Sequence, residues 1–170
     1  MKILFYKNNL QNNIPRLDEI TNLWKQNFND DMSLLPETHI GVLSIDDIIV
    51  GIVFLLFPTD LLLKKNDNIS NNLIAQNVTI DDCYLYNFCI SANEQKKGYG
   101  SRLLEQTEEY VKEYVKEYVE EYVKKQNINK VILFVKGDNV PAIKLYNNFK
   151  YKVQKATPNG FIMEKILSIV

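Results

Sequence analysis

The stretch ISANEQKKGYGSRLL, residues Ile90–Leu104, decides the fold of this chain because it joins a strand to a helix through glycines. The preceding run Cys83–Ile90 is apolar and aromatic, as is typical of a β-strand, and a long helical pattern follows. Gly98 and Gly100 allow tight backbone conformations, so a ligand can approach the backbone closely. The first N–H groups of a helix carry partial positive charge and bind anions. The stretch therefore predicts a phosphate-binding loop, best suited to a pyrophosphate.

Other glycine-loop motifs fit this stretch less well. A dinucleotide-binding fingerprint needs a third glycine where Leu103 stands, and an acid about 20 residues further on. A P-loop needs Gly-Lys-Ser/Thr after a four-residue spacer, which the stretch does not contain. Gln95, Lys96 and Lys97 at the loop's mouth add donors and positive charge. A structural turn with no ligand stays open as the alternative from the loop alone.

Two sequence blocks resemble the GNAT superfamily of N-acetyltransferases. Residues 95–100, QKKGYG, resemble the family's Q/R-x-x-G-x-G/A signature. Residues 139–146, NVPAIKLY, are similar to its later segment that contacts acyl-CoA. The blocks stand in the family's order, one strand apart, and the resemblance covers roughly Met1–Lys165. It implies an N-acetyltransferase that uses acetyl-CoA and an amine acceptor whose identity the sequence leaves open.

The resemblance also implies roles for individual residues. Backbone groups of the strand and loop would hold the acetyl donor, namely Phe88, Cys89, Ile90, Gln95, Lys96, Lys97, Gly98, Tyr99, Gly100 and Ser101. N–H groups of that strand would stabilise the oxyanion, and Asn139 would contact the pantetheine arm. Tyr146 matches the family's usual general acid, since a phenol with a pKa of about 10 can protonate a thiolate. A core tyrosine on an amphipathic helix is the alternative for Tyr146.

The general base cannot be assigned from the sequence. Relatives often carry an acid on the strand before the loop, where this chain has Tyr84, Tyr86 and Asn87. Asp81 and Asp82 lie at the start of that strand, and a chain of water molecules to solvent is a further route. Two other reactive residues are interpreted as structural. His39 opens a strand, and Cys89 is a strand thiol with no sequence-linked base.

Three positions depart from the family's pattern. Lys150 stands where the family usually has glycine, Tyr151 where phenylalanine is usual, and Ala92 where proline is frequent. These departures concern local turns.

Composition restricts the class of protein. At 170 residues, with 46% apolar and 24% charged residues, the chain is expected to form one soluble domain over 1–170. The net charge of −1 gives no field that favours nucleic acid or an anionic membrane. The longest apolar run, Ile48–Phe57, is about half a membrane span. Met1–Lys7 is too short and too quickly charged for a signal peptide. There is no His/Cys cluster that would predict a metal, and a reducing, cytoplasmic compartment fits best.

Periodicity predicts a mixed α/β fold of order β-α-β-β-β-α-β-α-β-β. The expected strands are Met1–Lys7, Ile40–Ile45, Ile48–Phe57, Cys83–Ile90, Lys130–Lys136, Phe149–Ala156 and Gly160–Ile166. The expected helices are Ile14–Phe28, Tyr99–Gln126 and a last helix that has Pro141 in its first turn and runs to about Asn148. Asp138 or Asn139 would cap the last helix. The resemblance adds that Tyr84–Ile90 and Lys130–Lys136 splay apart around the pantetheine arm. The long connection Thr59–Asp82, with a short helix at Asp60–Lys65, is expected to border the acceptor site.

The helix after the loop carries an unusual repeat. Glu-Tyr-Val-Lys occurs in four successive units over Glu109–Lys124, the third unit ending in Glu120. A helix over Tyr99–Gln126 would be about 40 Å long, so its distal half should project. Exposed Tyr-Val surface would favour a symmetric homodimer through Glu109–Lys124. A simple helical expansion without function is the alternative.

Acetyl transfer by direct attack in a ternary complex is the leading functional interpretation. Two others stay open: a non-catalytic acyl-CoA-binding or sensing module, because no base is assigned, and an assembly protein that uses the long helix.

Overall fold

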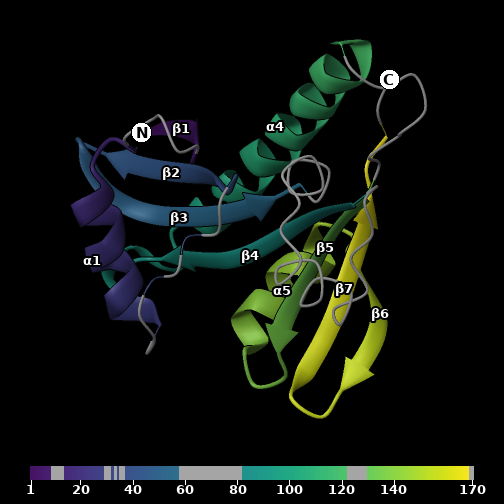
Figure 1. Cartoon of the computed structure of the whole chain (residues 1–170). Helices are drawn as coiled ribbons and strands as arrows, with labels where there is room; N and C mark the ends of the chain where they lie inside the picture. Colours follow the sequence, from purple (N-terminus) through teal and green to yellow (C-terminus); the bar gives the residue numbers. More distant parts are fainter. Residues whose placement is uncertain are drawn as a thin grey trace. The chain divides into compact units, whose positions relative to one another are not determined.

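The computed structural model describes residues 1–8, 14–28, 32, 34, 37–57, 82–121 and 130–168, with 117–121 described by their backbone alone. Its elements alternate as the sequence predicts, which confirms the mixed α/β fold (Figure 1). In chain order they are β1 (Lys2–Lys7), α1 (Leu17–Asn27), β2 (His39–Ile45), β3 (Ile48–Leu56), β4 (Asp82–Ile90), the 3-10 turn η1 (Ala92–Glu94), α4 (Tyr99–Glu121), β5 (Lys130–Lys136), α5 (Val140–Asn148), β6 (Lys152–Thr157) and β7 (Gly160–Ile166).

The strands follow the hydrogen-bonded order β1-β2-β3-β4-β5-β7-β6. The pair β4 and β5 is parallel, whereas β1–β2, β2–β3, β5–β7 and β6–β7 are antiparallel. The chain folds as two compact units, and β4 contributes to both of them. The first unit holds residues 1–56 and 87–110, and the second holds 57–86 and 111–170.

In the first unit, a hairpin of β2 and β3 carries the core. Its turn residues Asp46 and Asp47 both have left-handed φ, 48° and 64°, as a two-residue hairpin requires. Strand β3 is buried from Ile49 to Leu56, and helix α1 packs against it. Trp24 of α1 stacks on Phe54 with ring centroids 5.4 Å apart.

The first part of helix α4, up to Tyr110, also belongs to this unit. Tyr110 stacks on Phe5 of β1, with ring centroids 4.1 Å apart. Gly41 of β2 makes room for the Phe5 ring, since a Cβ at Gly41 would lie 2.5 Å from Cε1 of Phe5. His39, fully buried, shares a hydrogen bond of 2.6 Å between its Nδ1 and the Tyr110 hydroxyl. This contact supports the structural interpretation of His39.

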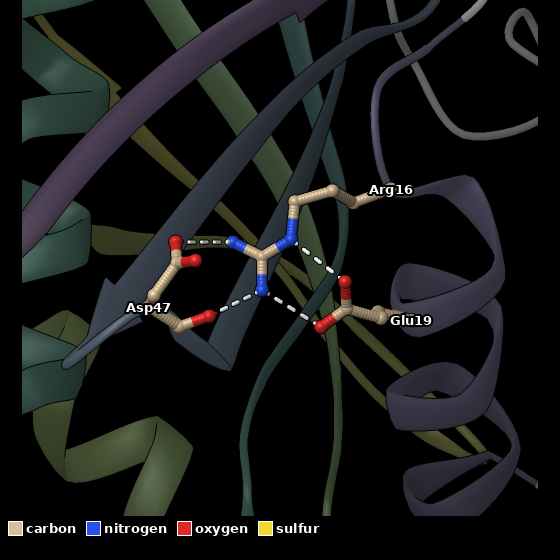
Figure 2. Close-up of polar contacts among 3 residues, drawn as sticks. All are labelled: Arg16, Glu19 and Asp47. Carbon is tan, nitrogen blue, oxygen red and sulfur yellow. Dashed lines mark hydrogen bonds and ion pairs between the residues drawn. The ribbon is translucent and has the colours of Figure 1, made fainter.

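Helix α1 begins later than expected, at Leu17, because Arg16 adopts a left-handed conformation with φ 60°. Figure 2 shows how the Arg16 guanidinium then joins the helix to the β2–β3 turn. It donates two hydrogen bonds of 2.7 Å to the carboxylate of Glu19. It also donates to Asp47, to Oδ1 at 3.2 Å and to the backbone oxygen. One side chain thus positions the start of α1.

In the second unit, β6 and β7 form the expected final hairpin around Pro158 and Asn159. Gly160 is required there, because a Cβ would lie 2.1 Å from the backbone oxygen of Val135. The prediction that β6 starts at Phe149 is wrong. Residues 149 and 150 form the turn that ends α5, and the strand begins at Lys152.

Two expectations concern residues outside the described ranges. The connection Thr59–Asp82 is described only at Asp82, so its short helix at Asp60–Lys65 and its closeness to an acceptor stay predictions. Helix α4 is described to Glu121, a length of about 35 Å. Its predicted continuation to Gln126 lies beyond that part of the chain.

Candidate functional site

Strand β4 carries a backbone irregularity just before the predicted donor-binding residues. Its pairing with β5 ends at Leu85, opposite Leu133. Asn87, two residues later, has φ 59°, in the left-handed region that asparagine tolerates better than most residues. A left-handed residue interrupts the pleat and redirects the N–H groups that follow it. The sequence marks Asn87 only as a candidate base, although the low frequency of asparagine in strands signals an irregular strand at this residue.

The predicted donor-binding residues of β4 and the loop all lie in the first unit, and backbone contacts hold them in place. Ser91 N–H donates to Val50 of β3 at 2.8 Å. The side-chain amide of Gln95 donates to the backbone oxygen of Ile90 at 3.0 Å, which ties the loop to the end of β4. Gln95 thus positions the loop, a role not predicted from sequence. Lys97 pairs with Glu94 at 3.0 Å, so part of its positive charge is offset.

The loop ends at the start of α4, where the backbone can receive an anion. Gly98 has φ 85° and accepts the first helical hydrogen bond, from Arg102 N–H at 3.1 Å. The N–H groups of Tyr99, Gly100 and Ser101 belong to the first turn, which has no intrahelical acceptors. That turn contains no acidic residue. A Cβ at Gly98 would meet no atom within 4 Å, so the backbone faces open space.

This geometry fits a phosphate group. A helix N-terminus binds a pyrophosphate oxygen when it has partial positive charge, N–H groups without intrahelical acceptors, and a glycine that leaves the backbone uncovered. Lys96, exposed and with φ 61°, adds an ammonium group at the same loop.

Phe88, Cys89 and Ile90 are the residues of β4 that are predicted to hold the donor through their backbone. The side chain of Cys89 has no nucleophilic character. Burial raises the pKa of the Cys89 thiol to about 12, and a backbone hydrogen bond with Ile52 offsets this only in part. At neutral pH the group is therefore a thiol, which is a poor nucleophile.

The two remaining predicted residues lie on α5 in the second unit. Asn139 caps the helix, because its Oδ1 accepts from Ala142 N–H at 3.2 Å. Its amide oxygen is thus engaged, and its NH₂ group is the part suited to meet a ligand carbonyl. Tyr146 is 4% exposed, and its ring lies 5.6 Å from that of Tyr151. Burial raises the pKa of the Tyr146 phenol, so it stays protonated across the neutral and mildly alkaline range.

Three of the candidate bases, Asp82, Tyr84 and Tyr86, make structural contacts. Asp82 is 1% exposed and lies 3.4 Å from the ammonium of Lys130, as expected of a structural ion pair. Tyr84 and Tyr86 stack on each other with centroids 5.8 Å apart. Asp81 lies outside the described residues.

Within the described ranges, no group of three or more His, Cys, Asp or Glu side chains is arranged to hold a metal ion. None of the helices in the described part of the chain is long and apolar enough to cross a membrane.

Solved structures share this fold at low sequence identity. The ribosomal-protein-S18-alanine N-acetyltransferase from Escherichia coli has a TM-score of 0.64 at 13% identity, covering 99% of this chain and 96% of its own. Ard1 from Thermoplasma volcanium has a TM-score of 0.64 at 14% identity, covering 98% of each chain. The PaiA N-acetyltransferase from Thermoplasma acidophilum, solved in complex with coenzyme A, has a TM-score of 0.61 at 15% identity, covering 98% of this chain and 99% of its own.

No curated protein matches the chain in sequence. A family model does: residues 8–117 match the acetyltransferase (GNAT) family, a range that contains the loop and most of α4 but ends before α5. Since that match spans more than half of the residues, this chain belongs to the GNAT acetyltransferase family.

Proposed function

We propose that this protein transfers an acetyl group from acetyl-CoA to a primary amine by direct attack in a ternary complex. The observation that carries the proposal is the uncovered backbone at Gly98, which starts a helix with no acidic residue in its first turn. A diphosphate fits that end of the helix by charge and by hydrogen bonding. Family membership and the coenzyme A complex of the Thermoplasma acidophilum relative support this ligand.

When bound, acetyl-CoA supplies a thioester whose acyl carbon bonds to the amine nitrogen, while the C–S bond breaks, the nitrogen loses a proton and the departing sulfur gains one. The chain's own residues hold and orient the reactants. First-turn N–H groups of α4 bind the diphosphate, and Gln95 keeps the loop against β4. The N–H groups after Asn87 are redirected by its left-handed conformation and stabilise developing negative charge on an acyl oxygen.

Tyr146 is the proposed proton donor. Burial raises the pKa of the Tyr146 phenol, so the proton to be donated is present at neutral and mildly alkaline pH. Asn139 orients the donor through its NH₂ group, since its oxygen caps α5. The departing amine proton has no assigned acceptor among the described residues, and solvent is the simplest route for it.

We also propose a cytoplasmic location and a homodimer. Cys83 and Cys89 are both free thiols, which suits a reducing compartment. The dimer would use the distal repeat units 117–124, whose side chains lie outside the described residues.

Calorimetric titration with acetyl-CoA tests the donor site. Gly98→Asn keeps a residue that tolerates left-handed φ but places a side chain in the open space. We expect it to weaken acetyl-CoA binding at least about tenfold, because the side chain occupies the phosphate position. Asn93→Ala, on the exposed turn η1, is the matched control and should bind as the wild type does. Equal affinity in a folded Gly98→Asn protein would contradict the proposal.

Thiol release from acetyl-CoA over an amine panel tests the catalysis. Tyr146→Phe should lower turnover by roughly 10²-fold or more, as expected for loss of a general acid, with little change in acetyl-CoA affinity. Binding without thiol release for any amine would favour the non-catalytic acyl-CoA-binding module instead.

A further inference from the structure

Positive charge is concentrated in the C-terminal part of the chain. Residues 130–170 contain seven lysines and two acidic residues, Asp138 and Glu164, which gives this part a net charge of +5. The remaining residues carry a net charge of −6, because the whole chain has a net charge of −1. The near-neutral total therefore combines two strongly charged parts, and the basic part attracts anionic partners to its own surface.

Three of these lysines meet at one hollow in the second unit. The hollow has a volume of about 250 Å³ and is lined by Lys150, Lys152, Glu164, Lys165 and Ile166. Its lysines come from three segments, namely the turn after α5, strand β6 and strand β7. The hollow lies at the opposite end of α5 from Asn139, which caps the start of that helix. It is therefore separate from the residue matched to the pantetheine arm.

The charges that line the hollow favour an anionic ligand. Within the described ranges, neither Lys150 nor Lys152 takes part in an ion pair, and both residues are exposed. Glu164 lies opposite Lys152 in the β6–β7 pairing, and its carboxylate is 3.5 Å from the ammonium of Lys130, which lies outside the hollow. With three positive charges and one negative charge among its lining residues, the hollow keeps an excess of positive charge.

Two of the lysines are restrained. Lys150 has φ 70°, a left-handed conformation that glycine adopts at lower cost. The Lys165 ammonium lies 5.8 Å from the ring centroid of Phe149 and 5.7 Å from that of Tyr151, and such contacts hold a lysine in place. A strained backbone beside a restrained cation is typical of a binding site, because restraint lowers the entropy lost when a ligand binds.

The surroundings of the lysines favour a polypeptide over a nucleic acid. Ile166, an apolar side chain at the hollow, is 70% exposed, and a phosphate backbone would leave it uncovered. Residues 130–170 contain no arginine, and Tyr151 is only 3% exposed, whereas nucleic-acid sites rely on arginine and on accessible aromatic rings. Strand β6 comes last in the sheet order and is exposed along most of its length, so its outer backbone groups can pair with an extended chain.

The lysines have a structural alternative, since lysine on an edge strand prevents pairing between sheets. That role explains Lys152 of β6, but neither Lys150, which precedes the strand, nor Lys165 of β7. We propose that the hollow and the adjoining edge of β6 bind an acidic polypeptide segment in extended conformation, with apolar side chains among its Asp and Glu residues. Its carboxylates pair with the three lysines, and an apolar side chain covers Ile166. This interaction does not depend on acetyl transfer.

Fluorescence anisotropy with the full chain tests this surface. The probes are a labelled octapeptide in which Glu and Val alternate, the same peptide with Ser in place of Val, and a labelled single-stranded oligonucleotide. The Glu-Val peptide should bind at least about threefold more tightly than the Glu-Ser peptide, because it buries apolar surface against Ile166. Its affinity should fall as salt is raised, since the paired charges are exposed. Tighter binding of the oligonucleotide than of the Glu-Val peptide would assign the surface to nucleic acid and overturn the proposal.

Variants connect peptide binding to the hollow. Lys150→Gly, Lys152→Gln and Lys165→Gln should each weaken binding of the Glu-Val peptide by roughly two- to fivefold, the range of exposed charge pairs. Lys150→Gly suits the left-handed turn, so loss of the fold is not the cause of its effect. Ile166→Ser should weaken binding of the Glu-Val peptide but not of the Glu-Ser peptide. Lys144→Gln removes the same charge from an exposed residue of α5 outside the hollow and is the matched control.

No binding of the Glu-Val peptide, or an equal loss of affinity in Lys144→Gln and in the three lysine variants of the hollow, would overturn the proposal. Saturating acetyl-CoA should leave peptide binding unchanged. Displacement of the peptide by acetyl-CoA would place it at the donor's anion site and would also contradict the proposal. If no peptide binds and Lys152→Gln lowers the mass measured by light scattering, the surface faces a second copy of the chain instead.

Discussion

Lys150 is a lysine in a conformation that favours glycine. It follows α5 with φ 70°, at the position where the family usually has glycine. Left-handed φ costs a residue with a Cβ roughly 1–2 kcal/mol. The positive charge at the carboxyl end of α5 offsets part of that cost. The departure from the family's pattern therefore leaves the turn intact but strained.

Lys150→Gly should raise the free energy of unfolding by about 0.5–1 kcal/mol, the relief of strain less the added freedom of the unfolded chain. Urea unfolding should show a higher midpoint and an unchanged slope. Lys152→Gly, within β6, is the control and should lower the midpoint, since glycine weakens a strand. A Lys150→Gly protein no more stable than the wild type would show that the turn is not strained.

The ionisation of Glu19 should make the stability of the fold depend on pH in the acidic range. The hydrogen bond from Arg16 holds its pKa below the usual range, while the same contact raises the pKa of Arg16. Because the pKa of Glu19 is lower in the folded state, its ionised carboxylate stabilises the fold at pH values above its unfolded-state pKa of about 4.3. This contribution to stability is lost as the pH falls through the folded-state pKa.

The melting temperature of Glu19→Gln should therefore lie below that of the wild type at pH 7, and the gap should close towards about pH 3. Asp18→Asn removes another first-turn carboxylate, one outside the Arg16 cluster, and controls for the helix dipole. A gap that persists unchanged in acid would rule out ionisation of Glu19 as its cause.

At the scale of elements, the first two repeat units of α4 are part of the core. Val111 and Val115 are 1% and 2% exposed. Tyr110 stacks on Phe5, and Tyr114 lies 4.4 Å from Phe57 between ring centroids. Exposed Tyr-Val surface is therefore not found over residues 109–116, where side chains are described. The repeat units have nearly the same sequence, so only their position along the helix determines whether their side chains are buried.

That repetition predicts an unusual tolerance to deletion. Removing Glu113–Lys116 places Tyr118 and Val119 at the positions of Tyr114 and Val115, so the packed residue types are kept. The deletion should cost less than about 1 kcal/mol by urea unfolding, within the range of mild substitutions. Removing only Glu113–Val115 places Tyr118 where Val115 was buried and should cost several times more, because it overpacks that site. Similar losses for both deletions would show that the repeat's register has no role.

At the scale of the whole molecule, light scattering at micromolar concentration tests the proposed homodimer. The full chain should have the mass of a dimer, and deletion of Glu117–Lys124 should give a monomer, because the first two units are already packed within the subunit. This deletion keeps Tyr114 and Val115, so loss of their packing is not the cause of any change. A monomeric full chain, or a dimer that survives the deletion, would refute the proposal.

The sequence by itself determined the order of elements, the hairpin at Asp46 and Asp47, and the strand-loop-helix unit around Gly98. These depend on local rules: hydrophobic period, turn residues and the conformational freedom of glycine. The Asn139 cap was also predictable, because a cap acts within three residues of its own position.

Only the tertiary structure decided how side chains are used. Gln95 donates to Ile90, Tyr110 binds His39, and Arg16 joins α1 to a distant turn. Each contact depends on which atoms the fold brings within hydrogen-bonding distance, and no local pattern records this. The same holds for the burial that raises the pKa of Tyr146, and for the hollow beside Lys150. Burial and cavities are set by non-neighbouring residues that pack together, so they exist only once the strands and helices have assembled.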